Sequence, residues 1–433
     1  GNEKTKTDQN GNATSFEYDG LLRKTAVISP SGNRKEFTYD EKNNITRVTV
    51  KPAPGSSKPD IITSFTYEPI YNQVETKTDA KGNTTTYHYF ENGKIRQIDQ
   101  PEVNGETYQA FFTYNSRAQL QTVTDPQGVM SKFQYDPVTG DLIRSISDYG
   151  TDPENKNIST EMTYDHVGNL ITTTDPEGNT TAFEYDLNRN LVRAVAPVPF
   201  NYVTKYQYDE QGQATAVHKQ TGDTANPWQT TGYTYTKSGK TKTVTDPLGN
   251  VTTYEHDELD RVTAVIDAEN NVTRQEYDPT GKVSKVIDAE NNAVVTKTYN
   301  VNGNLKTLQD ANGNITTYQY DDYQRLKKTI YPDTSFEELA YDENGNIVSR
   351  TTRSGQTISY EYDPLNRLNE KTLPGSDVTG YQYDSAGRLT AVTDSSGTIS
   401  NQYDVLGRLL QVTYPHGKQV SYGLRQHTET INH

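Results

Sequence analysis

Short stretches in which hydrophobic and polar residues alternate follow one another along the chain, separated by turn-forming residues. In the segment 271–291, residues 272–277 alternate, Asp278-Pro279-Thr280-Gly281 has the composition of a turn, and residues 282–287 alternate again before Asp288-Ala289-Glu290-Asn291. Alternation with a period of two places successive side chains on opposite faces of a strand. Pro, Asp, Asn and Gly are the residues that tight turns favour. We therefore predict a β-hairpin that a second tight turn joins to the next hairpin.

The hairpin pattern recurs at a spacing close to 21 residues, marked by a tyrosine that Asp most often follows. From Tyr235 to Tyr383 every interval is 21 or 22 residues, with His256 in the place of one tyrosine and Tyr422 as a further candidate. Such a register indicates one supersecondary unit that is repeated in tandem. We call these tyrosines the anchors; they are Tyr18, Tyr39, Tyr67, Tyr89, Tyr114, Tyr135, Tyr164, Tyr185, Tyr208, Tyr235, Tyr277, Tyr299, Tyr320, Tyr341, Tyr362, Tyr383 and Tyr403.

Other positions keep a fixed distance from the anchor. A second aromatic residue often stands two residues before it, as Phe16 and Tyr381 do, and an aliphatic residue such as Ile347 stands six residues after it. Residues i and i+2 of a strand share a face, so the two aromatic residues lie on one side of the predicted sheet. In many repeats Asp opens the second turn and Gly or Asn follows three residues later, as in Asp175 and Gly178.

These features predict an all-β fold of tandem β-hairpins in one continuous antiparallel sheet of nearly forty short strands. Because β-sheets twist, a ribbon of this width is expected to coil into a spiral or a hollow shell. We expect residues 1–433 to form a single array of about nineteen repeats, and to be a fragment of a longer protein because both ends fall inside a repeat. Insertions at 51–59, 148–157 and 222–228 are expected to be extended turns at the rim.

Composition limits the interior that this chain can build. Hydrophobic residues are only 31% of the chain, and there are 32 Tyr against 10 Phe and 1 Trp, which favours a thin sheet with polar groups on both sides over a large apolar core. The net charge of −15 argues against nucleic acid and anionic membrane surfaces as partners. The chain contains no Cys, so it forms no disulfide, and its apolar runs are too short for membrane insertion.

Several segments match a known type of repeat. Residues 383–389 (Tyr-Asp-Ser-Ala-Gly-Arg-Leu), 403–409 and 175–181 resemble the YD repeats of Rhs proteins, which also occur in bacterial wall-associated polymorphic toxins, toxin-complex cocoons and animal teneurins. The resemblance covers essentially the whole chain. It implies a coiled β-sheet that forms a hollow shell, which in the toxin members encloses a C-terminal toxin and in teneurins carries adhesion domains.

The resemblance also implies a conserved segment that, in toxin-bearing Rhs proteins, plugs the end of the shell and in many of them cleaves itself beside an Asp-Pro motif. No recognisable version of that segment precedes His433, so the resemblance assigns no cleavage residues to this chain. The Asp-Pro pairs occupy turn positions of the repeat instead.

Sequence motifs give no catalytic, cofactor-binding or metal site. The seven His have no ligand spacing, and His256 is interpreted as a substitute for an anchor tyrosine. Calcium binding by the turn carboxylates is an alternative, but neighbouring turn Asp residues are a full repeat apart and turn capping explains them. Aromatic residues outside the register could stack on sugar, although packing or loop anchoring is the simpler interpretation; they are Tyr149, Tyr202, Trp228, Tyr323 and Tyr331.

The leading hypothesis is a non-enzymatic shell segment of a secreted or surface-displayed bacterial protein, which encapsulates or presents an attached C-terminal effector such as a toxin. The partner would then be that covalently attached domain. The alternative is an extracellular adhesion protein that binds surface carbohydrate, or one that self-associates into a fibre through unpaired edges. A carbohydrate-active enzyme is a third interpretation, and it requires acids and aromatic residues gathered in one pocket.

Overall fold

The alternating segments of the sequence form short β-strands in a computed structural model, which describes residues 2–152 and 156–422. The described chain contains 38 strands in one antiparallel sheet, and its only helical element is a 3-10 turn at Pro415–Gly417. The prediction of an all-β chain with nearly forty short strands is confirmed.

The strands have the following bounds: β1 Thr5–Thr7, β2 Ala13–Tyr18, β3 Lys24–Ile28, β4 Arg34–Tyr39, β5 Ile45–Val50, β6 Ile61–Tyr67, β7 Val74–Thr78, β8 Thr84–Tyr89, β9 Ile95–Val103, β10 Glu106–Tyr114, β11 Leu120–Thr124, β12 Met130–Tyr135, β13 Leu142–Ser147, β14 Ile158–Tyr164, β15 Leu170–Thr174, β16 Thr180–Tyr185, β17 Leu191–Val195, β18 Val203–Tyr208, β19 Ala214–Gln220, β20 Trp228–Tyr235, β21 Thr241–Thr245, β22 Val251–His256, β23 Val262–Ile266, β24 Val272–Tyr277, β25 Val283–Ile287, β26 Ala293–Tyr299, β27 Leu305–Asp310, β28 Ile315–Tyr320, β29 Leu326–Ile330, β30 Phe336–Tyr341, β31 Ile347–Thr351, β32 Thr357–Tyr362, β33 Leu368–Thr372, β34 Val378–Tyr383, β35 Leu389–Asp394, β36 Gly397–Tyr403, β37 Leu409–Thr413 and β38 Gln419–Ser421.

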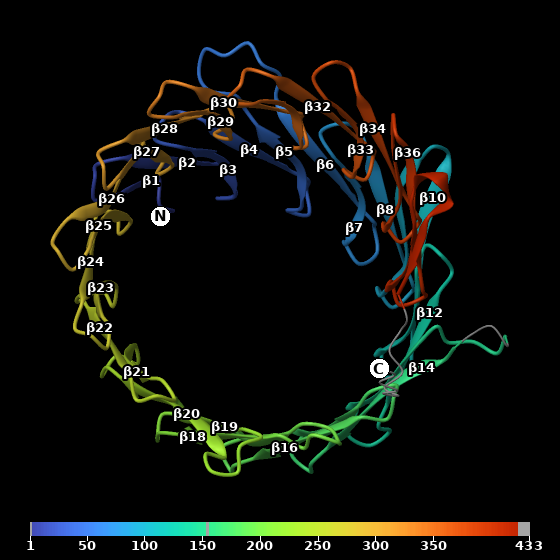
Figure 1. Cartoon of the computed structure of the whole chain (residues 1–433). Helices are drawn as coiled ribbons and strands as arrows, with labels where there is room; N and C mark the ends of the chain where they lie inside the picture. Colours follow the sequence, from blue (N-terminus) through green and yellow to red (C-terminus); the bar gives the residue numbers. More distant parts are fainter. Residues whose placement is uncertain (1, 153–155, 423–433) are drawn as a thin grey trace. The chain divides into compact units, whose positions relative to one another are not determined.

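The chain divides into two compact units. Unit 1 contains residues 1–129, 279–282 and 296–433, and unit 2 contains residues 130–278 and 283–295. Within each unit the strands form a meander, in which a strand pairs antiparallel with its neighbours in sequence, as β2 does with β3 and β15 with β16. In Figure 1 the strands of unit 1 are coloured blue to cyan and orange to red.

Two kinds of turn alternate along the meander, and both have the predicted chemistry. The YD turn begins one residue after the anchor, as in 165–169, and the return turn leads into the next repeat, as in 175–179. In the return turn, Oδ1 of Asp175 accepts hydrogen bonds from the amides of Glu177 and Asn179 at 3.0 and 2.8 Å, and Oδ2 accepts one from Asn179 Nδ2 at 2.9 Å. Gly178 has φ = 84°, a left-handed conformation that glycine adopts without steric cost. The carboxylate therefore closes the turn by satisfying backbone amides.

Most hairpins contain an irregularity at the anchor that the alternation did not reveal. The pairing register shifts between the anchor and the residue before it, for example between Ala340 and Tyr341, which pairs with Ile347. Such a β-bulge bends the strand and increases its local twist. Two residues before the anchor, the aromatic residue faces a β-branched partner, as Phe16 faces Val27. Cross-strand pairs of this kind each contribute about 0.2–1 kcal/mol to a sheet.

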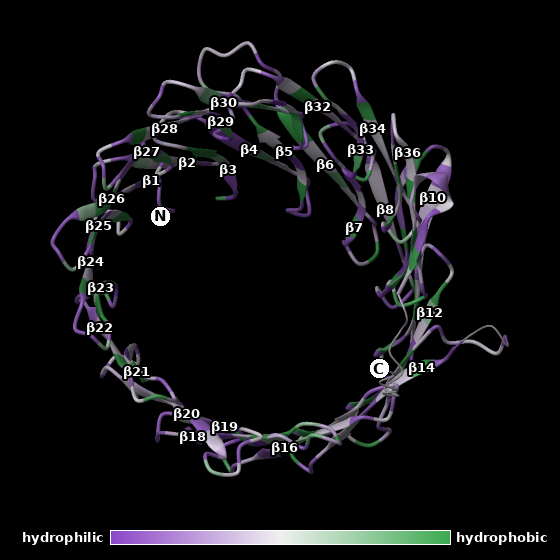
Figure 2. Ribbon diagram, in the orientation of Figure 1, coloured by the Kyte–Doolittle hydropathy of each residue, from purple (hydrophilic) through white to green (hydrophobic). Residues whose placement is uncertain are grey.

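The sheet has little apolar interior. Among the described residues the buried hydrophobic side chains are few and mostly small, such as Ala26 and Ala264, and no large side chain is fully buried. Figure 2 shows hydrophobic and hydrophilic residues interspersed along the strands. This agrees with the composition and means that backbone pairing, turn capping and cross-strand contacts carry the stability.

Insertions between anchors are accommodated in two ways. Residues 51–60 form an extended loop between β5 and β6, as expected. The interval from Tyr89 to Tyr114 is lengthened within the hairpin itself, because β9 and β10 are nine residues long each. Residues 153–155 of the insertion at 148–157 lie outside the described residues.

Replacement of Asp175 by Ala removes the three hydrogen bonds to its carboxylate. We expect the free energy of local opening around β15 and β16 to fall by about 1–2 kcal/mol, the usual cost of a lost cap. Hydrogen exchange followed by mass spectrometry measures this loss. Because tandem repeats contact mainly their neighbours, protection of β30 and β31 should stay unchanged. The control Asp175→Asn keeps the Oδ1 acceptor and should lose less, whereas a uniform loss over all strands would contradict this account.

Candidate functional site

The anchor hydroxyls link each repeat to the one before it. Tyr341 Oη donates a hydrogen bond to the carbonyl oxygen of Leu326 at 2.7 Å, and Leu326 is itself the cross-strand partner of the preceding anchor, Tyr320. Burial raises the pKa of the Tyr341 hydroxyl, which keeps it protonated as a donor. Hydroxyl-to-carbonyl bonds of 2.5–3.0 Å are made in this way by Tyr18, Tyr39, Tyr67, Tyr89, Tyr164, Tyr208, Tyr235, Tyr277, Tyr320, Tyr341, Tyr362, Tyr383 and Tyr403. Phenylalanine at these positions could not form the link.

Three other anchor positions also end their strands at a bulge. Tyr135 pairs with Leu142, Tyr185 with Leu191 and His256 with Val262, each after a register shift. Tyr299 ends β26, and Tyr422 follows β38. His256 thus occupies the anchor position in the sheet.

Arginines five residues after some anchors form a second link, which the spacing analysis missed. Arg325 Nε donates to Asp321 Oδ2 at 2.7 Å, and its Nη1 donates to the carbonyl oxygen of Asp342 in the next YD turn at 2.8 Å. Its guanidinium carbon lies 4.6 Å from the centre of the Tyr341 ring. One planar cation therefore ties a turn carboxylate, the next turn and the next anchor together. In the sequence an Arg recurs directly before the aliphatic residue, as in Gly387-Arg388-Leu389, and this recurrence could have indicated the link.

Unit 1 contains two stretches of the ribbon that lie edge to edge (Figure 1). Layer A is the set of five repeats anchored by Tyr18 to Tyr114, and layer B is the set anchored by Tyr299 to Tyr383. Return turns of layer A contact YD turns of layer B, and we call this contact the seam. Asn302 Nδ2 donates to Ser31 Oγ at 2.6 Å, and Asn344 Nδ2 donates to Asp79 Oδ2 at 2.7 Å. Two stretches some 270 residues apart in sequence are thus joined by polar contacts.

The seam keeps a constant register of twelve anchors. The return turn or loop of each layer A repeat meets the YD turn of the repeat twelve places later along the chain. The five pairs are 29–33 with 300–304, 51–60 with 321–325, 79–83 with 342–346, 103–108 with 363–367, and 125–129 with 384–388. The first of these return turns also reaches 321–325, where Asn33 Nδ2 donates to the carbonyl oxygen of Asp322 at 2.6 Å. Because the offset is the same for all five pairs, each contact joins a return turn or loop of layer A to a YD turn of layer B.

Charged groups reinforce the seam. Lys58 Nζ lies 3.2 Å from Asp322 Oδ2, and Lys81 Nζ lies 3.3 Å from Asp342 Oδ2. Hydrogen bonds from Lys58 and then from Ser56 lower the pKa of the Asp322 carboxyl. Burial alone would raise the pKa of Asp342, but hydrogen bonds from Asn346 and Lys81 outweigh it and the pKa is lowered. Both acids are therefore held ionised against their partners.

The aromatic residues outside the register make contacts within the protein. The Tyr323 hydroxyl donates to the carbonyl oxygen of Pro59 in the seam, and the Tyr331 ring lies 4.1 Å from the guanidinium of Arg353. Lys132 packs over Tyr149, and Tyr202 stacks on Phe200. The Trp228 ring contacts Lys205 at 4.7 Å. These aromatic residues are engaged in packing and loop anchoring.

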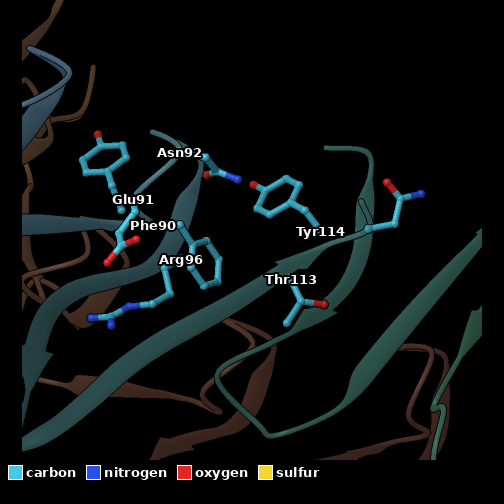
Figure 3. A pocket seen from close by; sticks show the side chains of 8 residues that line it. Phe90, Glu91, Asn92, Arg96, Thr113 and Tyr114 are labelled. Carbon is cyan, nitrogen blue, oxygen red and sulfur yellow. The ribbon is translucent and has the colours of Figure 1, made fainter. Parts of the chain in front are cut away.

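An open pocket of about 780 Å³ lies between the YD turns 90–94 and 115–119 of layer A (Figure 3). Phe90 replaces the usual turn Asp here and packs edge-on against Tyr114, with ring centres 6.3 Å apart. Figure 3 shows the Tyr114 hydroxyl directed towards Asn92. Within residues 2–152 and 156–422 this hydroxyl makes no hydrogen bond to a carbonyl oxygen, unlike those of most other anchors. The altered turn thus leaves an amphipathic hollow at the edge of the layer.

Histidines and acids are dispersed over the described residues. His88 Nε2 lies 2.7 Å from Asp99 Oδ2, and His218 Nδ1 lies 2.9 Å from Thr230 Oγ1. In the described ranges no three His, Asp or Glu side chains come together as candidate metal ligands. That part of the chain also contains no helix with the length and hydropathy needed to span a membrane. His427 and His433 lie outside the described residues.

Substitution of Tyr341 by Phe removes one inter-repeat hydrogen bond and leaves the ring in place. We expect the free energy of unfolding to fall by about 0.5–1.5 kcal/mol, as measured by denaturant titration, because the carbonyl of Leu326 loses its partner. Tyr114→Phe is the matched control and should change this free energy by far less. Equal losses for the two variants would show that the hydroxyl link is not the source of the effect.

Acidification should open the seam. A carboxyl whose pKa is lowered by folding contributes stability above its ordinary pKa of about 4, and this stability is lost as the pH falls through the lowered value. We therefore expect the exchange protection factors of the Ser31 amide and of residues 79–83 to drop between pH 5 and pH 3. In the double variant Asp322→Asn, Asp342→Asn, protection at the seam should be weaker at pH 6 and depend less on pH. Unchanged protection of the parent at pH 3 would refute the ionic contribution.

Comparison with known proteins places these features in a family context. Residues 265–399 match the family model Teneurin YD-shell, and residues 164–197 and 235–272 match the family model RHS Repeat. The tRNA3(Ser)-specific nuclease WapA of Bacillus spizizenii is 31% identical over 144 residues, which are 31% of this chain and 6% of the relative.

Two solved structures are also similar. The TcdB2-TccC3-Cdc42 structure has 17% identity over 93% of this chain and 25% of that chain, with a TM-score of 0.39. The Tc holotoxin pore of Photorhabdus luminescens has 16% identity over 93% of this chain and 24% of that chain, with a TM-score of 0.37. The chain spans a small part of the relative and about a quarter of each solved chain. Residues 164–197 and 235–399 therefore match repeats of the RHS and teneurin YD-shell type, the type that the sequence resembles.

Proposed function

We propose that this chain is a wall segment of a secreted or surface-displayed bacterial protein, and that the wall separates an attached effector domain from its surroundings. All 433 residues would belong to one array of repeats with no reactive centre. The mechanism is steric, because a continuous sheet denies a covalently attached cargo the room and the surface it needs to fold and act.

The seam is the observation that supports this proposal. A wall built from layers of ribbon retains a cargo only if the layers are joined at their edges. In unit 1 five successive pairs of turns join two layers, through amide hydrogen bonds, two Lys–Asp ion pairs and the Arg388–Gln127 hydrogen bond of 2.8 Å. The buried ring of Tyr108 lies 5.3 Å from the Arg367 guanidinium in the same contact. Such contacts close the edge without requiring an apolar interior.

The nature of the wall and of the relatives supports the same function. Few large apolar side chains are buried in the described part of the sheet, so polar contacts hold the wall together without packing against a cargo. The WapA relative is named as a tRNA nuclease, and the matched segment is a small part of its length. This supports a repeat segment that accompanies an effector located elsewhere in a longer protein.

Carbohydrate binding is the weaker candidate. The aromatic residues proposed to stack on sugar pair with Arg353, Lys132, Lys205 and Phe200, or donate to Pro59. Rings in such contacts are less available to a ligand. The wall function needs no ligand-binding site.

Protease protection of a cargo tests the proposal. A small ribonuclease joined after residue 433 should be digested at least tenfold more slowly in the fusion than as a free domain. The double variant Lys58→Glu, Lys81→Glu places like charges in the seam and should restore rapid digestion. Lys306→Glu, on an exposed strand position away from the seam, is the matched control and should preserve protection. Digestion of the fused and free ribonuclease at equal rates would overturn the wall function.

A further inference from the structure

The seam contains asparagine–glycine pairs, which are a chemically labile sequence. In such a pair the glycine nitrogen can attack the asparagine side chain, because glycine has no Cβ that hinders the approach. The pair occurs six times in the chain, at Asn10, Asn92, Asn104, Asn302, Asn312 and Asn344. Asn302 and Asn344 lie in the YD turns 300–304 and 342–346 of layer B, and both donate hydrogen bonds across the seam. Two of the side chains that hold the seam can therefore be lost by deamidation.

The closed seam holds Asn344 in an unreactive arrangement. Its Nδ2 donates to Asp79 Oδ2 at 2.7 Å and to Asn366 Oδ1 at 2.9 Å. The amide of Gly345 donates to the carbonyl oxygen of Asp342 at 3.2 Å and closes the turn. Deamidation requires the Gly345 nitrogen to leave this bond and to reach the side-chain carbon of Asn344. Both partners of the reaction are thus engaged elsewhere while the seam is closed.

The group that faces Asn344 across the seam is a carboxylate that serves as an acceptor. Oδ1 of Asp79 accepts from the amides of Lys81 and Asn83 at 3.0 and 2.8 Å, and its Oδ2 accepts from Asn83 Nδ2 at 2.9 Å. The Lys81 ammonium in the same contact already pairs with Asp342 at 3.3 Å. A second carboxylate at position 344 would therefore place two anionic oxygens where a hydrogen bond now lies, and like charges at this distance repel.

Asn302 provides a comparison in the same register. Its Oδ1 accepts from the Ser31 amide at 3.1 Å, and its Nδ2 donates to Ser31 Oγ at 2.6 Å. Both Ser31 groups can act as donors, since a hydroxyl rotates to suit its partner. A carboxylate at position 302 would keep an acceptor for each of them. The same chemical change is thus tolerated at Asn302 and disruptive at Asn344.

We propose that Asn344 is a modification site at which deamidation makes opening of the seam permanent. Once the seam opens, the Gly345 nitrogen bonds to the side-chain carbon of Asn344, and the side-chain amide leaves as ammonia with the proton of that nitrogen. Water then opens the resulting succinimide ring to aspartate or isoaspartate. The new carboxylate faces Asp79 and opposes closure. Layers that would otherwise separate and rejoin are held apart after this reaction.

Deamidation rates at single sites test the first step. The full chain is incubated at pH 8, and mass spectrometry of tryptic peptides measures the loss of each asparagine. We expect Asn344 to react at least tenfold faster in the double variant Lys58→Glu, Lys81→Glu than in the wild type, because the opened seam releases its side chain. Asn92 Oδ1 bonds to an amide of its own turn, so Asn92 is the internal reference and should react equally fast in both chains. Lys306→Glu is the control and should leave every rate unchanged.

Aspartate variants test the second step by hydrogen exchange. Asn344→Asp should lower the protection of the amides of residues 79–83 at least tenfold, whereas Asn302→Asp should lower that of residues 29–33 by less than threefold. Adding Asp79→Asn to Asn344→Asp exchanges donor and acceptor across the contact and should restore protection to within about threefold of the wild type. A merely structural disturbance of the turn would not be reversed by this exchange.

Equal rates of Asn344 deamidation in the wild type and the double variant, each relative to Asn92, would overturn the proposal. An Asn344→Asp chain with wild-type protection at residues 79–83, or a loss that Asp79→Asn does not reverse, would also overturn it. The exchange measurements keep the proposal testable if the double variant fails to fold. Neither readout involves a fused cargo, so failure here is distinguishable from failure of the wall function.

Discussion

The bond from an anchor hydroxyl to the carbonyl of the preceding repeat is the interaction on which this structure depends. In the described residues no second sheet and no α-helix packs on the faces of this sheet, and most of its strands have only five or six residues, too few to be stable as isolated hairpins. The anchor closes its own hairpin by pairing with an aliphatic residue at the bulge, and its hydroxyl reaches back to the hairpin before. One side chain thus serves two repeats, which accounts for 32 Tyr against 10 Phe.

Polar side chains that stabilise single repeats also join layer A to layer B. The turn carboxylate that caps its own backbone, as Asp321 does, also receives the Arg325 guanidinium, which reaches on to the next turn. At the seam the same turns accept partners from another layer, so that Asp342 binds both Asn346 and Lys81. The same carboxylates therefore cap their own turns and bind partners from the other layer. This explains how a chain with 31% hydrophobic residues builds an ordered wall.

Local chemistry could be predicted from the sequence, and long-range contacts could not. Alternation located strands such as β24, and Asp175 with Gly178 identified a capped turn, because each depends on residues within about five positions. The bulge before Tyr341 left no mark in the alternation. The Tyr excess indicated a thin sheet with polar groups on both sides, but neither the hydroxyl bond nor its acceptor was predicted from it. The contact between Lys81 and Asp342 joins residues 261 positions apart in the sequence, and such a contact has no local signature.

The register of the seam constrains how such a chain can change its length. Residues added within one loop, such as 51–60, leave the order of the anchors intact, and this loop even supplies contacts through Ser56 and Lys58. Duplication or deletion of one whole repeat between the layers would instead bring every layer A turn opposite the wrong partner. The seam therefore tolerates changes of loop size, whereas the gain or loss of one whole repeat would mispair all five contacts at once.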